Sequence, residues 1–177
     1  MAVQSAALVS VEEYLSSSYE PDCDYVDGVL EERNLGEREH SRLQLALARY
    51  LGNRERQWNV WILPEQRIRI GPRRFRVPDL CVILRDREIE QVPTKPPLVC
   101  IEILSPEDRV VRIQARVDDY LNFGVAYVWV VNPADRRVWV YTSEGSREVK
   151  DRILATENPS LTVDLSEIYA GIDEEPR

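Results

Sequence analysis

The stretch VPDLCVILRD, residues 77–86, decides how the fold is interpreted. Its centre, residues 80–84, is an unbroken apolar run, which predicts a strand buried on both faces. Asp79 stands at the entrance of this strand, directly behind Pro78. Burying an ionised carboxylate is costly unless a cation or hydrogen-bond donors compensate it. The stretch therefore predicts a central sheet and also a partner for Asp79.

A second acid interrupts another apolar segment, LVCIEILS at residues 98–105, where Glu102 stands inside a predicted strand. If the two strands are neighbours, the carboxylates of Asp79 and Glu102 converge, and a cation between them would relieve their repulsion. Mg²⁺ takes one or two protein carboxylates together with water and substrate oxygens. Such an ion polarises a phosphate and activates a water for in-line attack. A metal ion is therefore one candidate partner for Asp79.

Two other environments are compatible with the same pattern. Each acid can be paired with an arginine, and the candidates are Arg67, Arg69 and Arg116. Each acid can also be partly exposed at the end of its strand. Spacing alone does not choose between a metal, an arginine and water.

The cysteines offer a further alternative. Alternation along the strands places Cys81 on the face of Asp79 and Cys100 on the face of Glu102. Because thiolates favour zinc, a zinc site of two cysteines and two acids is conceivable. A free cysteine in an apolar strand is, however, usually a small buried hydrophobe.

His40 and Glu65 are the remaining candidate side chains. Because His40 is the one histidine of the chain, multi-histidine metal sites are excluded and a Ser-His-Asp triad is disfavoured. It lies on the apolar stripe of a predicted helix and so points inward, either as a satisfied core or capping residue or as an auxiliary contact to a metal or phosphate. Glu65 either supplies a third carboxylate or is a solvated strand residue.

The order of the predicted elements indicates an α/β domain. A helix is expected over residues 37–51, two strands within 58–84 joined by a turn at 71–74, and a third strand at 98–105. A second helix is expected to begin with Ser105 as its cap and to end at Gly124, followed by a hairpin that turns at 132–135. This order predicts a central mixed sheet flanked by helices.

We expect a single domain over residues 1–177 with three parts. Residues 1–36 form an N-terminal helix and a hairpin that turns at Asp27-Gly28, residues 37–142 form the core, and residues 143–177 form a C-terminal extension.

Composition and charge exclude several classes of protein. The chain is 44% hydrophobic and 31% charged, so it is neither disordered nor fibrous. Its longest apolar run, residues 125–131, is too short for a membrane span, and the three cysteines form no CxxC pair, so a cytoplasmic protein without a membrane partner is expected. The net charge of −8 argues against a non-specific nucleic-acid coat protein.

Three groups of residues together resemble the PD-(D/E)XK nuclease superfamily: Pro78-Asp79, IEILSP at 101–106 and DDYLNFGVAYVWVVNP at 118–133. Within it the chain is similar to the Uma-type family of putative restriction endonucleases. Its N-terminal run is matched by VSVEEYL at 9–15, YVDGVLEER at 25–33 and EHSRLQLALARYL at 39–51, with His40 where that family commonly has histidine.

The resemblance implies a restriction-endonuclease-like core (αβββαβ), Mg²⁺ or Mn²⁺ bound by Asp79 and Glu102, and hydrolysis of DNA. The lysine expected two residues after the second acid is replaced by Leu104. In this family the lysine tends to lie on the following helix, at the position of Arg116, and Gln114 is a weaker candidate for that role. Arginine can stabilise a charged transition state but cannot be a general base, because its pKa stays above about 12.

The expected function is therefore that of a Mg²⁺-dependent endodeoxyribonuclease. The expected catalytic residues are Asp79, Glu102, Arg116, Glu65 and His40, and the expected phosphate contacts are Arg67, Arg69, Arg109 and Arg112. Two alternatives stay open: a nuclease-fold module that binds DNA or a protein without cutting, and a structural zinc protein. Many nuclease-fold proteins form homo-oligomers, but no stripe in this sequence is diagnostic of an interface.

Overall fold

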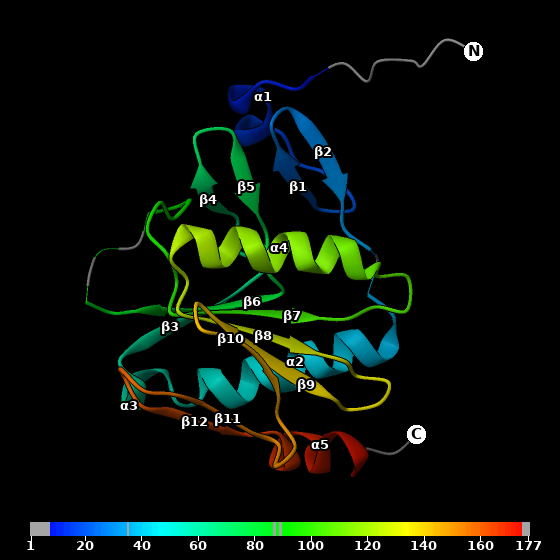
Figure 1. Cartoon of the computed structure of the whole chain (residues 1–177), viewed down its shortest axis with the longest axis vertical. Helices are drawn as coiled ribbons and strands as arrows, with labels where there is room; N and C mark the ends of the chain where they lie inside the picture. Colours follow the sequence, from blue (N-terminus) through cyan, green and yellow to red (C-terminus); the bar gives the residue numbers. More distant parts are fainter. Residues whose placement is uncertain (1–7, 35, 87, 89, 175–177) are drawn as a thin grey trace.

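The computed structural model describes residues 8–34, 36–86, 88 and 90–174. Its centre is a six-stranded sheet in the order β10-β9-β8-β7-β6-β3 (Figure 1). The strands are β3 (Val60–Pro64), β6 (Leu80–Leu84), β7 (Val99–Ile103), β8 (Tyr127–Val131), β9 (Val138–Thr142) and β10 (Gly145–Glu148). The pair β7–β8 is parallel and the other neighbours are antiparallel, so the sheet is mixed, as predicted.

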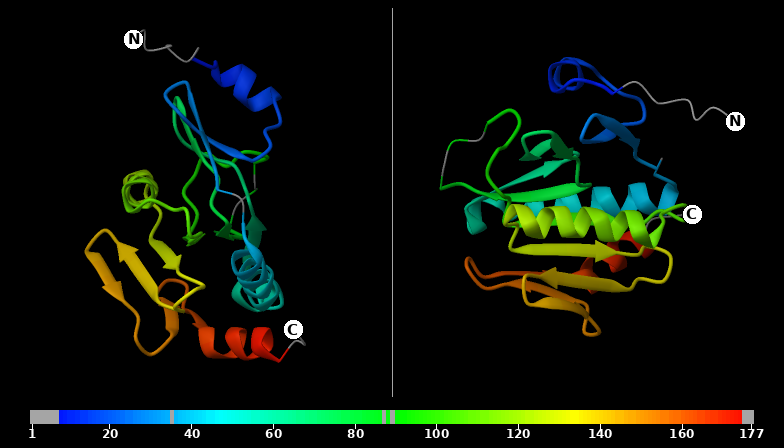
Figure 2. Two further views of the ribbon diagram at one scale, coloured as in Figure 1. Left: turned by 90° about the vertical axis from the view of Figure 1, so that its right-hand side faces the viewer. Right: turned by 45° about the horizontal axis from the view of Figure 1, so that its top comes forward.

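Helices cover both faces of this sheet (Figure 2). On one face lie α2 (Arg38–Gly52) and α5 (Leu165–Asp173), together with the hairpin of β11 (Ile153–Thr156) and β12 (Leu161–Asp164). On the other face lies α4 (Val110–Phe123). A short helix, α3 (Glu55–Trp58), leads from α2 into β3. The succession α2, β3, β6, β7, α4, β8 confirms the expected αβββαβ core.

The apolar patterns explain why these elements pack as they do. The stripe predicted along α2 is buried at Leu43, Leu47 and Leu51, which pack on alternate residues of the strands. The opposite strand residues pack against α4. Because both faces of β6 and β7 are covered, an acid on either strand is buried wherever it points.

A second sheet, in the order β2-β1-β5-β4, lies above α4 in Figure 1. It combines β1 (Cys23–Val26) and β2 (Val29–Glu32) with β4 (Ile68–Gly71) and β5 (Arg74–Arg76), and α1 (Val11–Ser16) packs on it. Its own small core consists of Tyr14, Tyr25 and Phe75. The N-terminal hairpin turns at Asp27-Gly28 as predicted, with positive φ at both residues.

The expectation of two strands within residues 58–84 is wrong, because the segment forms four strands in two sheets. The backbone at Glu65 is left-handed (φ 49°), which turns the chain out of the central sheet after β3. The following hairpin, β4–β5, then pairs with β1 rather than with β6. The chain re-enters the central sheet only after Pro78.

The second helix begins at Val110 with Arg109 as its N-cap, four residues later than the expected cap at Ser105. The Ser105 N–H donates to Asp108 Oδ2 (2.7 Å), and the Asp108 N–H donates to the Ser105 carbonyl (3.0 Å). These bonds close a separate turn before the helix. The helix ends at Gly124 as predicted, in the left-handed conformation (φ 105°). Among the described residues, no helix is long and apolar enough to cross a membrane.

Candidate active site

Asp79 and Glu102 face each other across β6 and β7. The antiparallel register pairs Leu80 with Ile101, so one further step places Asp79 opposite Glu102. Alternation turns both acids toward α4. Their side chains are 5% and 1% exposed. The condition set by the sequence, that the two strands be neighbours, is therefore met.

Arg33 lies between the two acids. It follows directly after β2, and its Nη2 pairs with Asp79 Oδ1 while lying 3.8 Å from Glu102 Oε2. Its Nη1 donates to the carbonyl of Val77. The side chain is only 11% exposed. The partner of Asp79 in this structure is therefore an arginine, as one alternative proposed, but not one of the arginines that the sequence suggested.

Two side chains of α4 hold Glu102. Arg116 Nη1 lies 3.2 Å from Glu102 Oε2, and the Tyr120 hydroxyl donates to Oε1 (2.6 Å). The two residues are one helical turn apart and so present their polar groups to the same strand. The structure thus brings Arg116 to the acid pair, as the sequence predicted.

The second oxygen of Asp79 is held by the core. The Ile103 N–H donates to Asp79 Oδ2 (2.6 Å), and His40 Nε2 of α2 lies 3.5 Å from the same atom. His40 is 8% exposed, so it points inward as predicted. Its contact with Asp79 makes it part of the site.

These contacts give the two acids different protonation behaviour. Burial opposes the charge on Asp79, but Arg33 and the hydrogen bond with His40 hold the pKa of Asp79 below its usual value. Burial raises the pKa of Glu102 despite Arg116 and Arg33. Burial also disfavours the charge on His40, yet its hydrogen bond to Asp79 leaves the His40 pKa raised. Asp79 is therefore the more firmly ionised acid of the pair.

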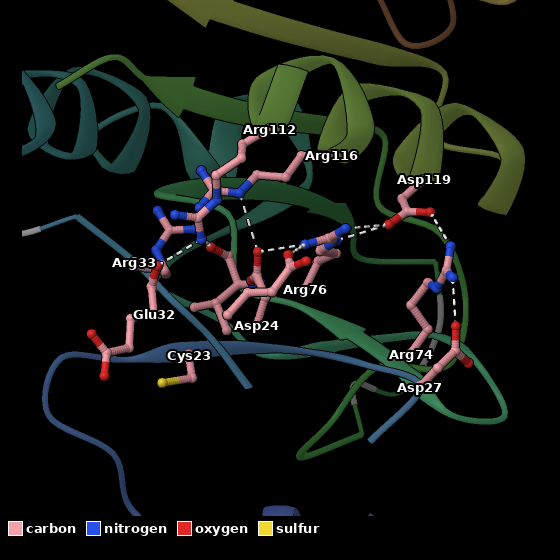
Figure 3. Close-up of polar contacts among 12 residues, drawn as sticks. Cys23, Asp24, Asp27, Glu32, Arg33, Arg74, Arg76, Arg112, Arg116 and Asp119 are labelled. Atoms are coloured by element: carbon pink, nitrogen blue, oxygen red, sulfur yellow. Dashed lines mark hydrogen bonds and ion pairs between the residues drawn. The ribbon is translucent and has the colours of Figure 1, made fainter. Parts of the chain in front are cut away.

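A third buried acid, Asp24 of β1, extends this cluster (Figure 3). Asp24 Oδ2 lies 3.1 Å from Arg116 Nε and 2.9 Å from Arg76 Nη1, and Oδ1 accepts from the Val77 N–H (2.9 Å). Arg76 in turn pairs with Asp119 of α4 (2.6 Å). Arginines therefore join the four-stranded sheet to α4 and to the acid pair.

Sequence reasoning missed Arg33, Asp24 and Tyr120. A signal for Asp24 existed, because it stands between Cys23 and Tyr25 in a short apolar run, like the other two acids. Tyr120 stands within the stretch 118–133, but no acid or cysteine pattern marks it as a site residue. Arg33 follows two glutamates in a polar stretch, and nothing in that stretch indicates burial.

Two other candidates do not reach the acid pair. Glu65 follows β3 in line with Asp79, but its left-handed backbone leaves its side chain exposed, where Oε1 accepts from Gln44 Nε2 (3.1 Å). Gln114 is exposed and donates to Asp118 Oδ1 (2.8 Å). The structure thus does not bring Glu65 to the acids as a third carboxylate.

The four arginines expected to contact phosphates are separated. Arg67 stacks on the Tyr14 ring, with its Cζ 4.3 Å from the ring centre, and Arg69 donates to the carbonyls of the β4–β5 turn. Arg109 is exposed just before α4, and Arg112 donates to the Glu32 carbonyl (2.8 Å), beside Arg33. Arg112 is therefore the arginine of this group that lies next to the acid cluster.

Cys81 and Cys100 stand directly opposite each other but lie in an apolar cluster. Burial raises the pKa of Cys81 to about 12 and holds that of Cys100 well above its usual value, so both thiols stay protonated. No group of three or more His, Cys, Asp or Glu residues within the described part of the chain is arranged to hold a metal ion. The geometry therefore favours buried hydrophobes over zinc ligands.

A cavity of about 430 Å³ adjoins the site. Trp139 and Tyr141 of β9 line it together with the first turns of α4, and acidic side chains, among them Asp108, also line it. His40 lines the cavity and also contacts Asp79. His40 therefore links the cavity to the acid pair, although neither Asp79 nor Glu102 lines the cavity itself.

The acid pair fits Mg²⁺ by its chemistry, because this ion takes one or two protein carboxylates and completes its shell with water and substrate. Two buried carboxylates from adjacent strands supply that set. Asp79 Oδ1, however, is engaged by Arg33. The donors thus suit the ion, and Arg33 competes for one of them.

Comparison with known proteins identifies a family and a similar fold. The sequence pattern of the Uma2 family, described as putative restriction endonuclease, matches residues 11–171. The fold is similar to the crystal structure of a putative nuclease belonging to DUF820 from Anabaena variabilis, with a TM-score of 0.80 and 20% identity over 92% of this chain and 98% of that chain. The curated proteins include no match to this chain.

Proposed function

Because the chain belongs to the Uma2 family of putative restriction endonucleases, we propose that it is a Mg²⁺-dependent endonuclease that cleaves DNA. The observation that carries the proposal is the placement of Asp79 opposite Glu102, with both side chains turned toward α4. Buried acids that face each other are unfavourable for stability alone, which favours a functional reason for their presence.

We assign each side chain of the site a separate role in the proposed reaction. Asp79 and Glu102 hold Mg²⁺, which when bound supplies a Lewis acid for the phosphate and lowers the pKa of water. His40 orients Asp79, and Tyr120 orients Glu102. Arg116 positions Glu102, and its permanent positive charge stabilises the negative charge that develops on the phosphate. Since arginine cannot accept a proton, no protein base is assigned.

DNA reaches this site along the start of α4. We assign phosphate contacts to Arg112, which lies beside Arg33, and to Arg109, which is exposed just before α4. Arg67 and Arg69 are not assigned this role, because their guanidinium groups are engaged elsewhere. Phosphate contacts of this kind supply affinity without sequence preference.

The proposal is tested by nicking of supercoiled plasmid with Mg²⁺ or Mn²⁺. Asp79→Asn keeps the volume of the side chain but removes the charge that holds the ion, so we expect nicking to fall by about a hundredfold or more. The matched control is Glu148→Gln, which removes a partly exposed acid of β10 that pairs with Arg137 and should leave nicking unchanged. Circular dichroism verifies that both variants fold. Equal nicking by the wild type and Asp79→Asn would refute the assignment.

A module that binds DNA without cutting is the second candidate. The observation that favours it is the arginine pairing of both acids, together with Leu104 at the position of the superfamily lysine. This candidate predicts a mobility shift with DNA at low salt and no nicked product with either ion. Nicked product that depends on Asp79 would exclude it.

A further inference from the structure

The contacts of Arg33 have a consequence for the metal site. We propose that Arg33 is a built-in competitor of the metal ion: its guanidinium group closes the acid pair, and the ion binds only when Arg33 leaves. This inference rests on the proposed function in one respect, that Asp79 and Glu102 are the metal ligands.

Position is the first argument. The guanidinium pairs with Asp79 Oδ1 and lies 3.8 Å from Glu102 Oε2. A Mg²⁺ ion sits about 2.0–2.1 Å from each carboxylate oxygen that it binds. An ion shared by Asp79 and Glu102 would therefore occupy the space that Arg33 Nη2 now fills. The other oxygen of Asp79 offers no substitute, because the Ile103 N–H and His40 hold it.

Charge is the second argument. Three buried acids face two buried arginines and the partly buried Arg33. The acids are Asp24, Asp79 and Glu102, and the buried arginines are Arg76 and Arg116. The acids Glu31 and Asp119 also contact Arg76 at the edge of this cluster, and His40 contacts Asp79. A divalent cation added beside Arg33 would place like charges a few ångströms apart in a poorly solvated site. With Arg33 withdrawn, the acids regain the negative charge that attracts the ion.

The location of Arg33 is the third argument. It belongs to the connector between β2 and α2, outside any helix or strand. Its backbone N–H donates to the Asp22 carbonyl (2.9 Å), and this bond is kept when only the side chain moves. Its 11% exposure shows that it reaches the acids from near the surface, whereas Arg116 reaches them from the buried face of α4. Of the three arginines in the cluster, Arg33 is therefore the one whose side chain can withdraw from the acids most easily.

The test measures Mn²⁺ affinity by calorimetry, without DNA and without turnover. Arg33→Gln removes the competing charge and keeps a hydrogen-bonding side chain, so we expect Mn²⁺ to bind about tenfold more tightly or better. The matched control is Arg85→Gln, which removes a part-buried arginine from an ion pair with Glu55 after the far end of β6. Its Mn²⁺ affinity should equal that of the wild type. Equal or weaker affinity in Arg33→Gln, or no binding to either protein, overturns the proposal.

A second measurement uses the wild type and does not depend on how a variant folds. The Nε–Hε resonance of Arg33 is followed by NMR during titration with Mg²⁺. Release of the guanidinium predicts that this resonance moves to the position of an exposed arginine as the site fills. A resonance that stays in place while other signals of the acid pair shift would refute the competition. Plasmid nicking separates the two proposals, because tighter Mn²⁺ binding by Arg33→Gln without any nicking would support the competitor and reject the endonuclease.

Discussion

The hydroxyl of Tyr120 is the hydrogen-bond donor to one carboxylate oxygen of the buried Glu102. It donates to Glu102 Oε1 at 2.6 Å, and both side chains are shielded from water. Tyr120→Phe leaves that oxygen without its donor, so we expect the free energy of unfolding to fall by about 1–3 kcal/mol. Urea denaturation measures the loss.

Tyr127→Phe is the matched control for this change. It removes a hydroxyl that accepts a hydrogen bond from the exposed Glu157 N–H (3.1 Å), where water can replace the lost partner. We expect the loss to be well below that of Tyr120→Phe. Equal losses from the two variants would show that the hydroxyl of Tyr120 does not stabilise Glu102.

The local sequence around each residue explains which site residues could be predicted. A single acid inside an apolar strand, like Glu102, or directly before one, like Asp79, is conspicuous in the sequence. The structure shows that the two strands are neighbours, which brings the two acids together. Arg33 contacts Asp79 across 46 residues of chain and comes from a polar stretch. No local pattern encodes such a contact, because it arises only when the N-terminal hairpin packs over the core.

At the scale of elements, Arg76 of β5 joins three others. It pairs with Asp24 of β1 (2.9 Å), Glu31 of β2 (2.8 Å) and Asp119 of α4 (2.6 Å), and it is 3% exposed. Arg76→Met keeps the apolar stem but leaves buried carboxylates without this partner. Removing one member of a buried ion pair costs about 3–5 kcal/mol, so we expect a loss of that size in urea denaturation.

Two further variants separate charge from shape in this prediction. Arg137→Met is the surface control, because it removes an arginine that pairs with Glu148. Exposed ion pairs contribute about 0–1 kcal/mol to the free energy of unfolding, so we expect a loss no larger than that. The double change Asp24→Asn with Arg76→Met removes both charges and should be more stable than Arg76→Met alone. A double variant less stable than Arg76→Met would show that the loss does not come from the charge of Asp24, which then keeps Arg116 as its arginine partner.

Turn chemistry explains where element prediction failed. The alternation of apolar and polar residues within 58–84 fits two long strands as well as it fits four short ones. The structure forms four, because the left-handed backbone at Glu65 turns the chain out of the central sheet. Ser105 with Pro106 is a good helix start, yet Asp108 closes a turn with Ser105 first. At Glu65 a single backbone angle, and at Ser105 a competing hydrogen-bonded turn to a residue three positions later, outweigh the local pattern.

At the scale of the whole molecule, the packing of α4 on the central sheet shields the thiols of Cys81 and Cys100 from solvent. Cys81 and Cys100 stand in the central sheet beneath α4, and both are completely buried. Burial raises the pKa of Cys81 to about 12, so at pH 8 the reactive thiolate is scarce even where a reagent could reach it.

We therefore expect Cys81 and Cys100 to react with Ellman's reagent at pH 8 only when the whole domain opens. For a stability in the usual range, such opening slows the reaction by about a thousandfold or more relative to a free thiol. In concentrated urea all three cysteines should react at once. A chelator should leave the protection unchanged, because the thiols are shielded by packing rather than by zinc. Rapid reaction of the native protein would contradict this packing, and protection lost on chelation would restore the structural zinc alternative.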